Sequence, residues 1–287
     1  MRFVSFEQNG KAGLAVVRPS GEARGYLVDD ASFPGSLDTL IRVGAAGLHR
    51  AAERLGDGPA IDLAQVRYLA PFVGSEKILC VGLNYADHSK ESGYDLPPFP
   101  TIFGRFTSSL IGHGDALIRP RVSTQFDYEG EIVAVIGKDG RHIAKADALG
   151  YVAGYALFND GSVRDYQHMT PQWTVGKNFD GTGAFGPQFV TADELPAGVR
   201  GLQLQTRLNG EVVQHASTDD LVFDVASLIS LLSEAMTLRA GDLIVTGTPA
   251  GVGAARTPPL FMKAGDVCEV EVDGLGILRN PVADEQS

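Results

Sequence analysis

The chain has 287 residues, and 24 lysines and arginines against 35 aspartates and glutamates give it a formal net charge of −11. Nucleic acid and anionic membranes both need a basic surface on their partner, so this balance argues against either one. Hydrophobic residues at 44% and charged residues at 21% are typical of a globular protein and not of a disordered one.

Targeting and redox signals are consistent with the cytoplasm. No apolar run approaches the roughly 18–20 residues of a membrane span, and the first ten residues, MRFVSFEQNG, contain no apolar core of a secretory signal. Cys80 and Cys268 are too few for a disulfide framework and are expected to be buried thiols in a reducing compartment. We therefore expect a cytoplasmic protein.

The first 70 residues are predicted to form a small α/β domain. Turn residues such as Asn9-Gly10 and Ser20-Gly21 separate strand-like segments, and two helical patterns follow. The expected elements are strands at 2–6, 14–18 and 25–28 and helices near 36–43 and 48–55. The segment 69–72 marks the hinge, so the predicted domains are 1–70 and 71–287.

The remaining chain is rich in short strands. Apolar segments predict strands at 77–82, 126–136, 150–158, 202–208, 211–214, 243–245 and 267–272. Asn209-Gly210 predicts a hairpin, and Asp224 is expected to cap an amphipathic helix over 225–232. Because strands dominate and βαβ alternation is absent, the expected fold class is a β-rich α+β roll with few helices.

Carboxylates crowd the start of the apolar strand predicted at 126–136. Side chains alternate between the two faces of a strand, so Asp127, Glu129 and Glu131 are expected to share one face. Such a row is costly at the mouth of a buried strand unless it is solvated, paired or bound to a cation. On this segment alone, a solvated strand end remains an alternative.

A second acidic position lies where the strand predicted at 150–158 leaves the core, at Asp160. If Asp160 lies beside Glu131, three carboxylates converge on one cation, and no histidine or cysteine set at zinc spacing competes. Oxygen ligands suit hard ions, so the sequence predicts Mg²⁺, with Mn²⁺ or Ca²⁺ as alternatives.

A histidine and a lysine are candidates for the chemistry. His88 and Glu91 are i, i+3 neighbours if their segment is helical, and a carboxylate beside an imidazole suits a general base. An exposed ion pair of little consequence fits the same spacing. Lys177, flanked by glycine and aromatic residues, is a candidate cation in a cleft, although most lysines are solvated.

Weaker signals come from a short helical segment and from two glycine-rich ones. In a helix, Arg164 and Gln167 would face the same way as Asp160. The small residues around Thr248 expose backbone N–H groups that can hold a carboxylate. Residues 181–186 fit G-x-G-x-x-G, but a proline and a strand-like segment follow, so a nucleotide cofactor is not expected.

Taken together, these segments resemble the fumarylacetoacetate hydrolase superfamily, in particular its bacterial acylpyruvase and fumarylpyruvate hydrolase members. The resemblance covers about residues 75–287 and rests on motifs that come in the family's order. They are GLNYADH at 82–88, DYEGE at 127–131, FND at 158–160, GK at 176–177, FGP at 185–187, NGE at 209–211 and GDLIVTGTPAGVG at 241–253. The resemblance implies the rolled mixed β-sheet of the family's C-terminal domain, usually in a homodimer.

The resemblance also assigns roles. It implies that Glu129, Glu131 and Asp160 hold Mg²⁺ or Mn²⁺, and that His88 with Glu91 activates a water molecule.

For the substrate site, the resemblance implies that Lys177 and Gln167 contact the substrate or its developing anion. Thr248 is expected to contact a substrate carboxylate. Arg164 belongs to the same site, and Arg105 places a cation there where a lysine is more usual in the family.

The reaction that this resemblance implies is hydrolysis of a C–C bond in a 2,4-diketo acid of the acylpyruvate or fumarylpyruvate type, by the water that His88 activates. The alternatives are decarboxylation of a 2-oxo acid such as oxaloacetate, and isomerisation or hydration of an unsaturated 2-oxo dioate from aromatic catabolism. A further alternative, outside enzymes, is a structural or ligand-sensing β-roll that uses the cation for stability alone.

The segment 88–99 is expected to be mobile without ligand and to close over a bound 2-oxo acid. Small and polar residues follow His88, and Pro97, Pro98 and Pro100 end any helix there. A segment that buries little apolar area opens at small cost.

Overall fold

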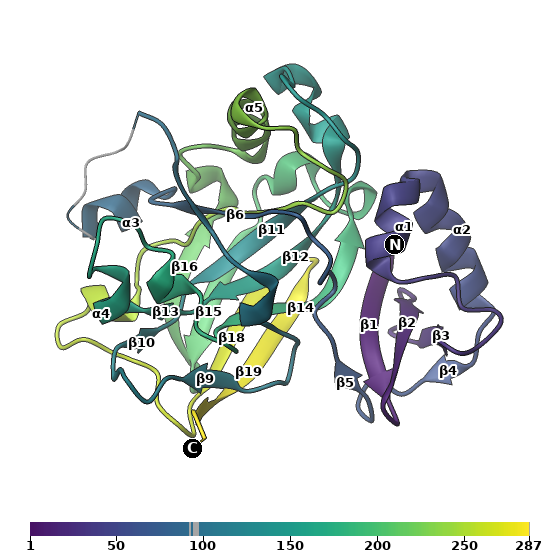
Figure 1. Cartoon of the computed structure of the whole chain (residues 1–287), viewed down its shortest axis with the longest axis horizontal. Helices are drawn as coiled ribbons and strands as arrows, with labels where there is room; N and C mark the ends of the chain where they lie inside the picture. Colours follow the sequence, from purple (N-terminus) through teal and green to yellow (C-terminus); the bar gives the residue numbers. More distant parts are fainter. Residues whose placement is uncertain (92, 94–97, 287) are drawn as a thin grey trace.

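The computed structural model describes residues 1–91, 93 and 98–286, and strands dominate it (Figure 1). The strands are β1 Arg2–Gln8, β2 Lys11–Val17, β3 Ala23–Leu27, β4 Ala60–Ile61, β5 Arg67–Tyr68, β6 Ile78–Gly82, β7 Thr101–Gly104, β8 Leu110–Ile111, β9 Leu117–Arg119, β10 Phe126–Asp127, β11 Gly130–Ile136, β12 Val152–Asp160, β13 Ser162–Val163, β14 Gly183–Thr191, β15 Gln203–Leu208, β16 Glu211–Ser217, β17 Leu243–Val245, β18 Val267–Val272 and β19 Gly276–Asp284. The α-helices are α1 Leu37–Val43, α2 Ala45–Gly56, α3 Ala86–Glu91, α4 Arg164–Gln167 and α5 Val225–Ala235. This content confirms the expected β-rich α+β class.

A twelve-stranded mixed sheet runs through the molecule in the order β4-β3-β2-β1-β14-β12-β11-β17-β6-β7, with β5 beside β1 and β8 beside β14. β11 is antiparallel to both β12 and β17, whereas β17 is parallel to β6. A five-stranded sheet, β16-β15-β18-β19-β9, shares a hydrophobic core with it, and β10 pairs with β13.

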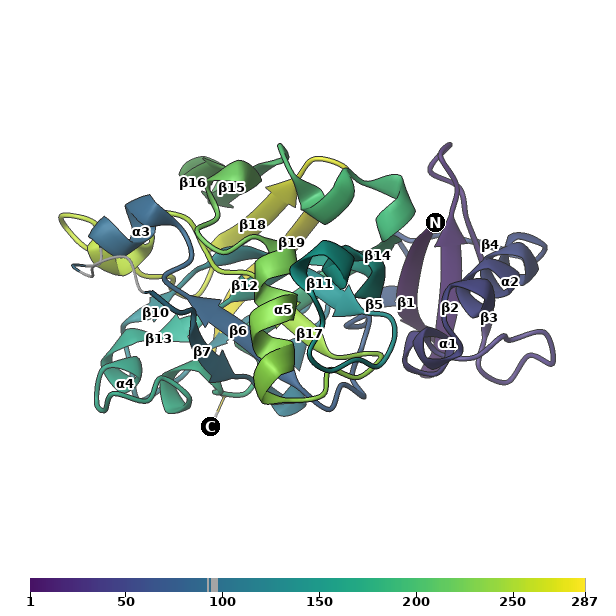
Figure 2. The same ribbon diagram turned by 90° about the horizontal axis from the view of Figure 1, so that it is seen from above.

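The central strands of the large sheet are buried on both faces. On β11, Ile132, Ala134 and Ile136 belong to the core shared with the five-stranded sheet and α5, whereas Val133 and Val135 belong to a second core with α1 and α2. Burial on both faces explains why this segment is a continuous apolar run. Figure 2 shows α5 lying over β11 and β17, and the N-terminal elements at one end of the molecule.

The N-terminal strands continue the large sheet. β1 pairs antiparallel with β14, where Phe3 lies opposite Phe189 with their ring centroids 6.3 Å apart. The three strands and two helices predicted in the first 70 residues are present, each within a few residues of its expected bounds. The boundary between domains near residue 70 stays a prediction.

The strand predicted at 126–136 is interrupted, which changes the place of one carboxylate. β10 ends at Asp127 and β11 begins at Gly130, so the three carboxylates do not lie on one continuous strand, although Arg164 pairs with both Asp127 and Glu129. Asp127 also accepts hydrogen bonds from the backbone N–H groups of Gly253 and Ala254, at 2.8 and 2.9 Å. These bonds offset the loss of solvation of a fully buried carboxylate.

The helix considered for residues 160–167 is also wrong. Asp160 is the last residue of β12, β13 then pairs back with β10, and α4 begins only at Arg164. Other local predictions are confirmed: β15 and β16 form the hairpin at Asn209-Gly210, and the glycine-rich segment 181–186 leads into β14 and not into a helix.

The start of α5 follows the predicted capping pattern and yields a stability prediction. The Asp224 side chain accepts a hydrogen bond from the Ser227 backbone N–H at 2.8 Å. Asp224→Ala is expected to lower the free energy of unfolding by about 1 kcal/mol, because it leaves an N–H group of the first helical turn unsatisfied. Asp224→Asn, which can still cap, is the control in a urea denaturation series. Equal losses in both variants would contradict the cap.

The cysteines and the helices bear on two expectations drawn from the composition. Cys80 and Cys268 are buried free thiols, as expected. In the part of the chain that the structure describes, no helix combines the length and the apolar character needed to cross a bilayer.

Candidate functional site

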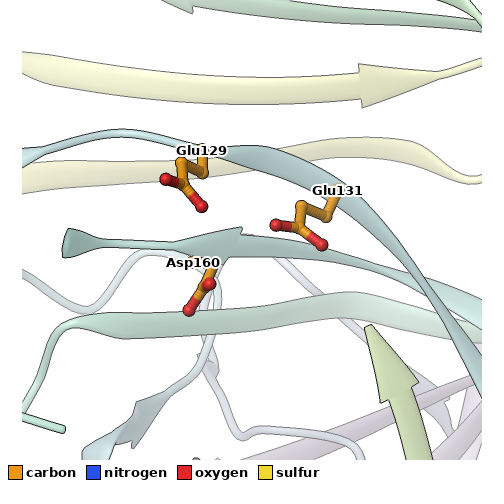
Figure 3. A group of neighbouring side chains, drawn as sticks. All are labelled: Glu129, Glu131 and Asp160. Atoms are coloured by element: carbon orange, nitrogen blue, oxygen red, sulfur yellow. The ribbon is translucent and has the colours of Figure 1, made fainter. Parts of the chain in front are cut away.

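Three buried carboxylates converge where β11 and β12 run side by side (Figure 3). Glu129 directly precedes β11, Glu131 lies in it, and Asp160 ends β12. The antiparallel register, with Gly130 opposite Asn159, brings the three side chains to the same place. One carboxylate oxygen from each lies within 4.8 Å of the others. The sequence prediction that Asp160 lies beside the two glutamates is therefore confirmed as geometry.

Three cations neutralise two of these carboxylates. Lys177 Nζ lies 2.7 Å from Glu129 Oε2 and 2.8 Å from Asp160 Oδ2. Arg164 Nη1 lies 2.6 Å from Glu129 Oε1, and Arg105 Nη1 lies 2.5 Å from Asp160 Oδ1. Burial by itself would raise the pKa of Glu129, but the charges of Lys177 and Arg164 outweigh it and lower that pKa to about 2.

Unlike Glu129 and Asp160, Glu131 has no ion pair among the described residues, and this lack of a partner fits a bound cation. Among the described residues no cationic side chain pairs with it, and its Oε2 accepts a hydrogen bond from the Gly247 N–H at 2.5 Å. Burial, then the negative charges of Asp160 and Glu129, raise the pKa of Glu131 well above its usual value. A buried carboxylate with two anionic neighbours and no ion pair needs added positive charge, and this all-oxygen set suits a hard divalent cation.

Arg105 does not occupy the place expected of a substrate contact. It is buried, and it is absent from the side chains that line the cavity beside the carboxylates. Its guanidinium donates to Asp160, to the Gly161 carbonyl at 3.2 Å and to Thr182 Oγ1 at 2.8 Å. The geometry therefore supports a role for Arg105 in orienting the Asp160 carboxylate, and not in contacting the substrate directly.

This arrangement predicts the effect of a charge-conserving substitution. Arg105→Lys keeps the cation but cannot reproduce the planar set of bonds to Asp160, Gly161 and Thr182. We expect Mg²⁺ or Mn²⁺ affinity, measured by titration calorimetry, to fall about 10–100-fold, as is usual when the partners of a metal ligand are lost. A matched variant is Gly183→Ala, whose new Cβ would lie 2.7 Å from Arg105 Nη2 and displace the guanidinium without removing it. Unchanged metal affinity in both variants would contradict this role.

His88 and Glu91 form the predicted pair on α3. His88 Nδ1 lies 3.0 Å from Glu91 Oε1, and both Glu91 oxygens accept from the Gly251 backbone N–H, at 2.9 and 3.0 Å. Because a carboxylate only accepts, Nδ1 carries the proton and the lone pair is on Nε2. Gly251 has φ +103°, and a Cβ there would meet the Val213 carbonyl at 2.1 Å, so the loop that holds Glu91 requires glycine.

The predicted mobility of 88–99 is not tested. Residues 92 and 94–97 lie outside the described residues. The part that is described places His88 as a buried side chain on a short helix held by Glu91.

A cavity of about 260 Å³, called here the inner cavity, brings these groups together. Its lining includes His88, Glu91, Glu129, Glu131 and Lys177. The base candidate and two of the three clustered carboxylates, Glu129 and Glu131, therefore face one small space, whereas Asp160 is not part of this lining.

Three predicted substrate contacts also line the inner cavity, namely Arg164, Gln167 and Thr248. Arg164 is buried and donates to Asp127 and Gln167, but its Nη2 has no hydrogen-bond partner among the described residues. This Nη2 is a buried atom with no partner in the described part of the chain, and the residue that carries it lines the inner cavity, so Arg164 places positive charge beside that space. The Thr248 hydroxyl is already engaged, because it donates to the Gly130 carbonyl at 3.0 Å and accepts from Gln214 at 2.8 Å.

Sequence reasoning missed several residues that shape this site. His168 and Trp173 line the inner cavity, and Gln214 ties Gly130 to the Thr248 loop. Gln214 was named with the NGE motif at 209–211 as part of the family resemblance, but no role was assigned to it. His168 and Trp173 had no signal in the sequence, because their positions depend on how the segment after α4 packs against β6 and β7.

Comparison with known proteins agrees with this geometry. The chain matches the family model "Fumarylacetoacetate (FAA) hydrolase C-terminal" over residues 77–283. It is 41% identical to "Oxaloacetate tautomerase Fahd2a, mitochondrial" of Rattus norvegicus and 38% identical to "Oxaloacetate tautomerase FAHD2A, mitochondrial" of Homo sapiens. Both alignments cover 98% of this chain and 91% of the relative.

Solved structures extend the comparison over the whole chain. The fumarylacetoacetate hydrolase from Exiguobacterium antarcticum is 36% identical, with a TM-score of 0.87 and coverage of 99% of this chain and 100% of the other. The 5-carboxymethyl-2-hydroxymuconate delta-isomerase from Mycobacterium smegmatis is 29% identical, with a TM-score of 0.78 and complete coverage of both chains. The rolled mixed-sheet fold implied by the motifs is thereby confirmed.

Proposed function

Because this chain belongs to the fumarylacetoacetate hydrolase family, we propose that it is a metal-assisted enzyme that interconverts the keto and enol forms of a small 2-oxo acid, with oxaloacetate as the first candidate. The observation that carries the proposal is that His88 lines the same inner cavity as Glu129 and Glu131. At about 260 Å³ this space is small even for a ligand pocket and suits a compact acid. The names of the full-length relatives favour oxaloacetate.

The histidine pair supplies the proton transfer. With Nδ1 bound to Glu91, His88 Nε2 accepts a proton from C3 of the substrate, and the imidazolium returns it to the oxygen on C2. One proton leaves carbon and one reaches oxygen, so the interconversion needs no further reactant. Glu91 stabilises the imidazolium between the two steps, because its carboxylate stays beside Nδ1.

Positive charge at the other side of the inner cavity favours the enolate. A divalent cation held by Glu129, Glu131 and Asp160 would act as a Lewis acid that makes the C3 protons more acidic. Arg164 lines the inner cavity, so its guanidinium can attract the substrate carboxylate. Burial alone would lower the pKa of Lys177, but Asp160 and Glu129 raise it, so its ammonium stays charged beside the developing anion.

A second candidate is the C–C hydrolysis of a 2,4-diketo acid, and the same His88–Glu91 pair favours it because the pair can equally deprotonate a water. Decarboxylation of oxaloacetate and isomerisation of an unsaturated 2-oxo dioate share the enolate and remain further variants. The predicted cytoplasmic location and homodimer stay predictions, as does the choice between Mg²⁺ and Mn²⁺.

One panel separates these reactions. Enol-oxaloacetate, acetylpyruvate and fumarylpyruvate are each incubated with the Mg²⁺-loaded protein, while enol absorbance and released products are followed. We expect rapid loss of enol absorbance from oxaloacetate without CO₂ release and slower or no cleavage of the diketo acids. Faster cleavage of the diketo acids would make hydrolysis the main function, and no turnover of any compound would leave the structural or sensing alternative.

A further inference from the structure

A second space adjoins the inner cavity and has no place in the proposed chemistry. This outer chamber measures about 660 Å³ and lies between β7 and the segment after α4. Four residues line both spaces, namely Leu83, Phe103, His168 and Trp173. Because four residues line both, the two spaces are adjacent, and a ligand with its head at the carboxylate cluster would have to pass these residues to reach the outer chamber.

Two of the residues that line both spaces, Phe103 and Trp173, are in ring contact with each other. Trp173 packs against Phe103 with ring centroids 5.6 Å apart and ring planes at 60°. A Cβ on Gly82 would lie 2.3 Å from the Trp173 ring, so only glycine at this position lets the indole reach its place. Lys177 Nζ lies 5.0 Å from the centroid of the Phe103 ring on the other side, which links this wall directly to the carboxylate cluster.

Leu83, which also lines both spaces, has an unusual backbone conformation. Its φ of 57° lies in the left-handed region, which leucine rarely adopts. Strained backbone of this kind persists where the surroundings hold it and is common at binding sites. Here it turns the chain between β6 and α3, so that Leu83 lines both spaces.

The lining of the outer chamber indicates the chemistry of its occupant. Of the residues that line only the outer chamber, Ile102, Met169 and Pro171 contribute apolar surface, and Thr101, Thr170 and Gln172 contribute uncharged polar groups. Among the described residues that line it there is no lysine, arginine, aspartate or glutamate. His168 is the one titratable side chain in that lining, and burial followed by the charges of Arg164 and Lys177 lowers its pKa. A neutral imidazole does not offset a second carboxylate, so the chamber suits an uncharged tail.

Resting on the proposed function for its 2-oxo acid head, we propose that the outer chamber is a second subsite for an unbranched apolar tail on the substrate. The substrates that fit this pair of spaces best are monocarboxylic 2-oxo acids longer than oxaloacetate. The head lies at the carboxylate cluster, the chain passes Trp173 and Phe103, and the tail ends against Met169 and Ile102.

The test measures binding, so it does not depend on turnover. The Mg²⁺-loaded protein is titrated calorimetrically with 2-oxobutanoate, 2-oxohexanoate, 2-oxooctanoate and 2-oxooctanedioate. We expect affinity to rise roughly two- to fourfold for each methylene added between 2-oxohexanoate and 2-oxooctanoate. The dioate, which ends in a charged group, should bind at least about tenfold more weakly than 2-oxooctanoate of the same length.

A variant that fills the outer chamber, and a matched control outside it, test whether the dependence of affinity on chain length arises in that chamber. Met169 is 65% exposed and lines only the outer chamber, so Met169→Trp should lower the affinity ratio of 2-oxooctanoate to 2-oxobutanoate about tenfold. Val212→Trp makes a similar change at a 53% exposed site on β16 and should leave that ratio unchanged. A ratio that Met169→Trp does not alter, or affinity independent of chain length, overturns the subsite while the proposed function stands. Absence of binding by every 2-oxo acid overturns both.

Discussion

Replacing His88 by alanine is expected to lower kcat for the interconversion of oxaloacetate about 10²–10⁴-fold, the usual range for loss of a general base. The reason is geometric: with Nδ1 held by Glu91, the free lone pair of His88 belongs to a ring that lines the inner cavity. Mg²⁺ affinity should not change, because His88 is not one of the three converging carboxylates. Stopped-flow measurement of enol absorbance gives kcat, and calorimetry gives the metal affinity.

The control for this variant is His215→Ala, which removes an exposed histidine on β16 that does not line the inner cavity. It should retain the wild-type kcat. If His88→Ala were as active as His215→Ala, the pair on α3 would be an ordinary ion pair and the proton would have to move to another group.

Glu131→Gln is expected to abolish both metal binding and activity. The substitution keeps the shape of the side chain but removes the negative charge of the one clustered carboxylate that has no ion pair among the described residues. The loss of metal affinity should exceed the 10–100-fold that is typical when only the partners of a ligand are changed. Glu269→Gln, on β18 and paired with Arg207, is the matched control and should bind metal normally.

The raised pKa of Glu131 gives this prediction a second readout. Burial and the charges of Asp160 and Glu129 raise the pKa of Glu131 and so favour its protonated form when no cation is present, whereas a ligand carboxylate must be deprotonated. Metal binding should therefore release a proton, and apparent affinity should rise with pH until Glu131 ionises unaided. Calorimetry in two buffers with different ionisation enthalpies counts the protons. Metal binding to the wild type without proton release, or full activity in Glu131→Gln, would contradict the assignment.

The sequence predicted the parts of the site that depend on local pattern. Glu129 and Glu131 lie at the start of a buried strand, and Asp160 lies where another strand leaves the core. Strand geometry made these carboxylates candidates, and the family resemblance joined them into one set. His88 and Glu91 were predicted as a pair because they lie three positions apart, which puts them on one helical face. Both predictions rely on the regular spacing of side chains within one or two strands or helices, and this spacing can be seen in a single sequence.

The relations that the sequence did not reveal depend on tertiary packing. At the break between β10 and β11, Asp127 accepts hydrogen bonds from the backbone N–H groups of Gly253 and Ala254, which are far from it in the sequence. The place of Arg105 behind Asp160 depends on room left by Gly183, which comes from β14. Glu91 is held by the Gly251 backbone N–H, and an N–H group is common to every residue except proline. No spacing rule points to such contacts.

A crystal of the protein grown with Mn²⁺ and oxalate, examined by anomalous diffraction, tests the central claim most directly. Oxalate reproduces the two adjacent oxygens of an enolised 2-oxo acid. The account predicts one strong Mn²⁺ peak between Glu129, Glu131 and Asp160, oxalate bound to that ion and to Arg164, and His88 Nε2 facing it. A Mn²⁺ peak elsewhere, or no peak with Lys177 still bridging Glu129 and Asp160, would contradict it.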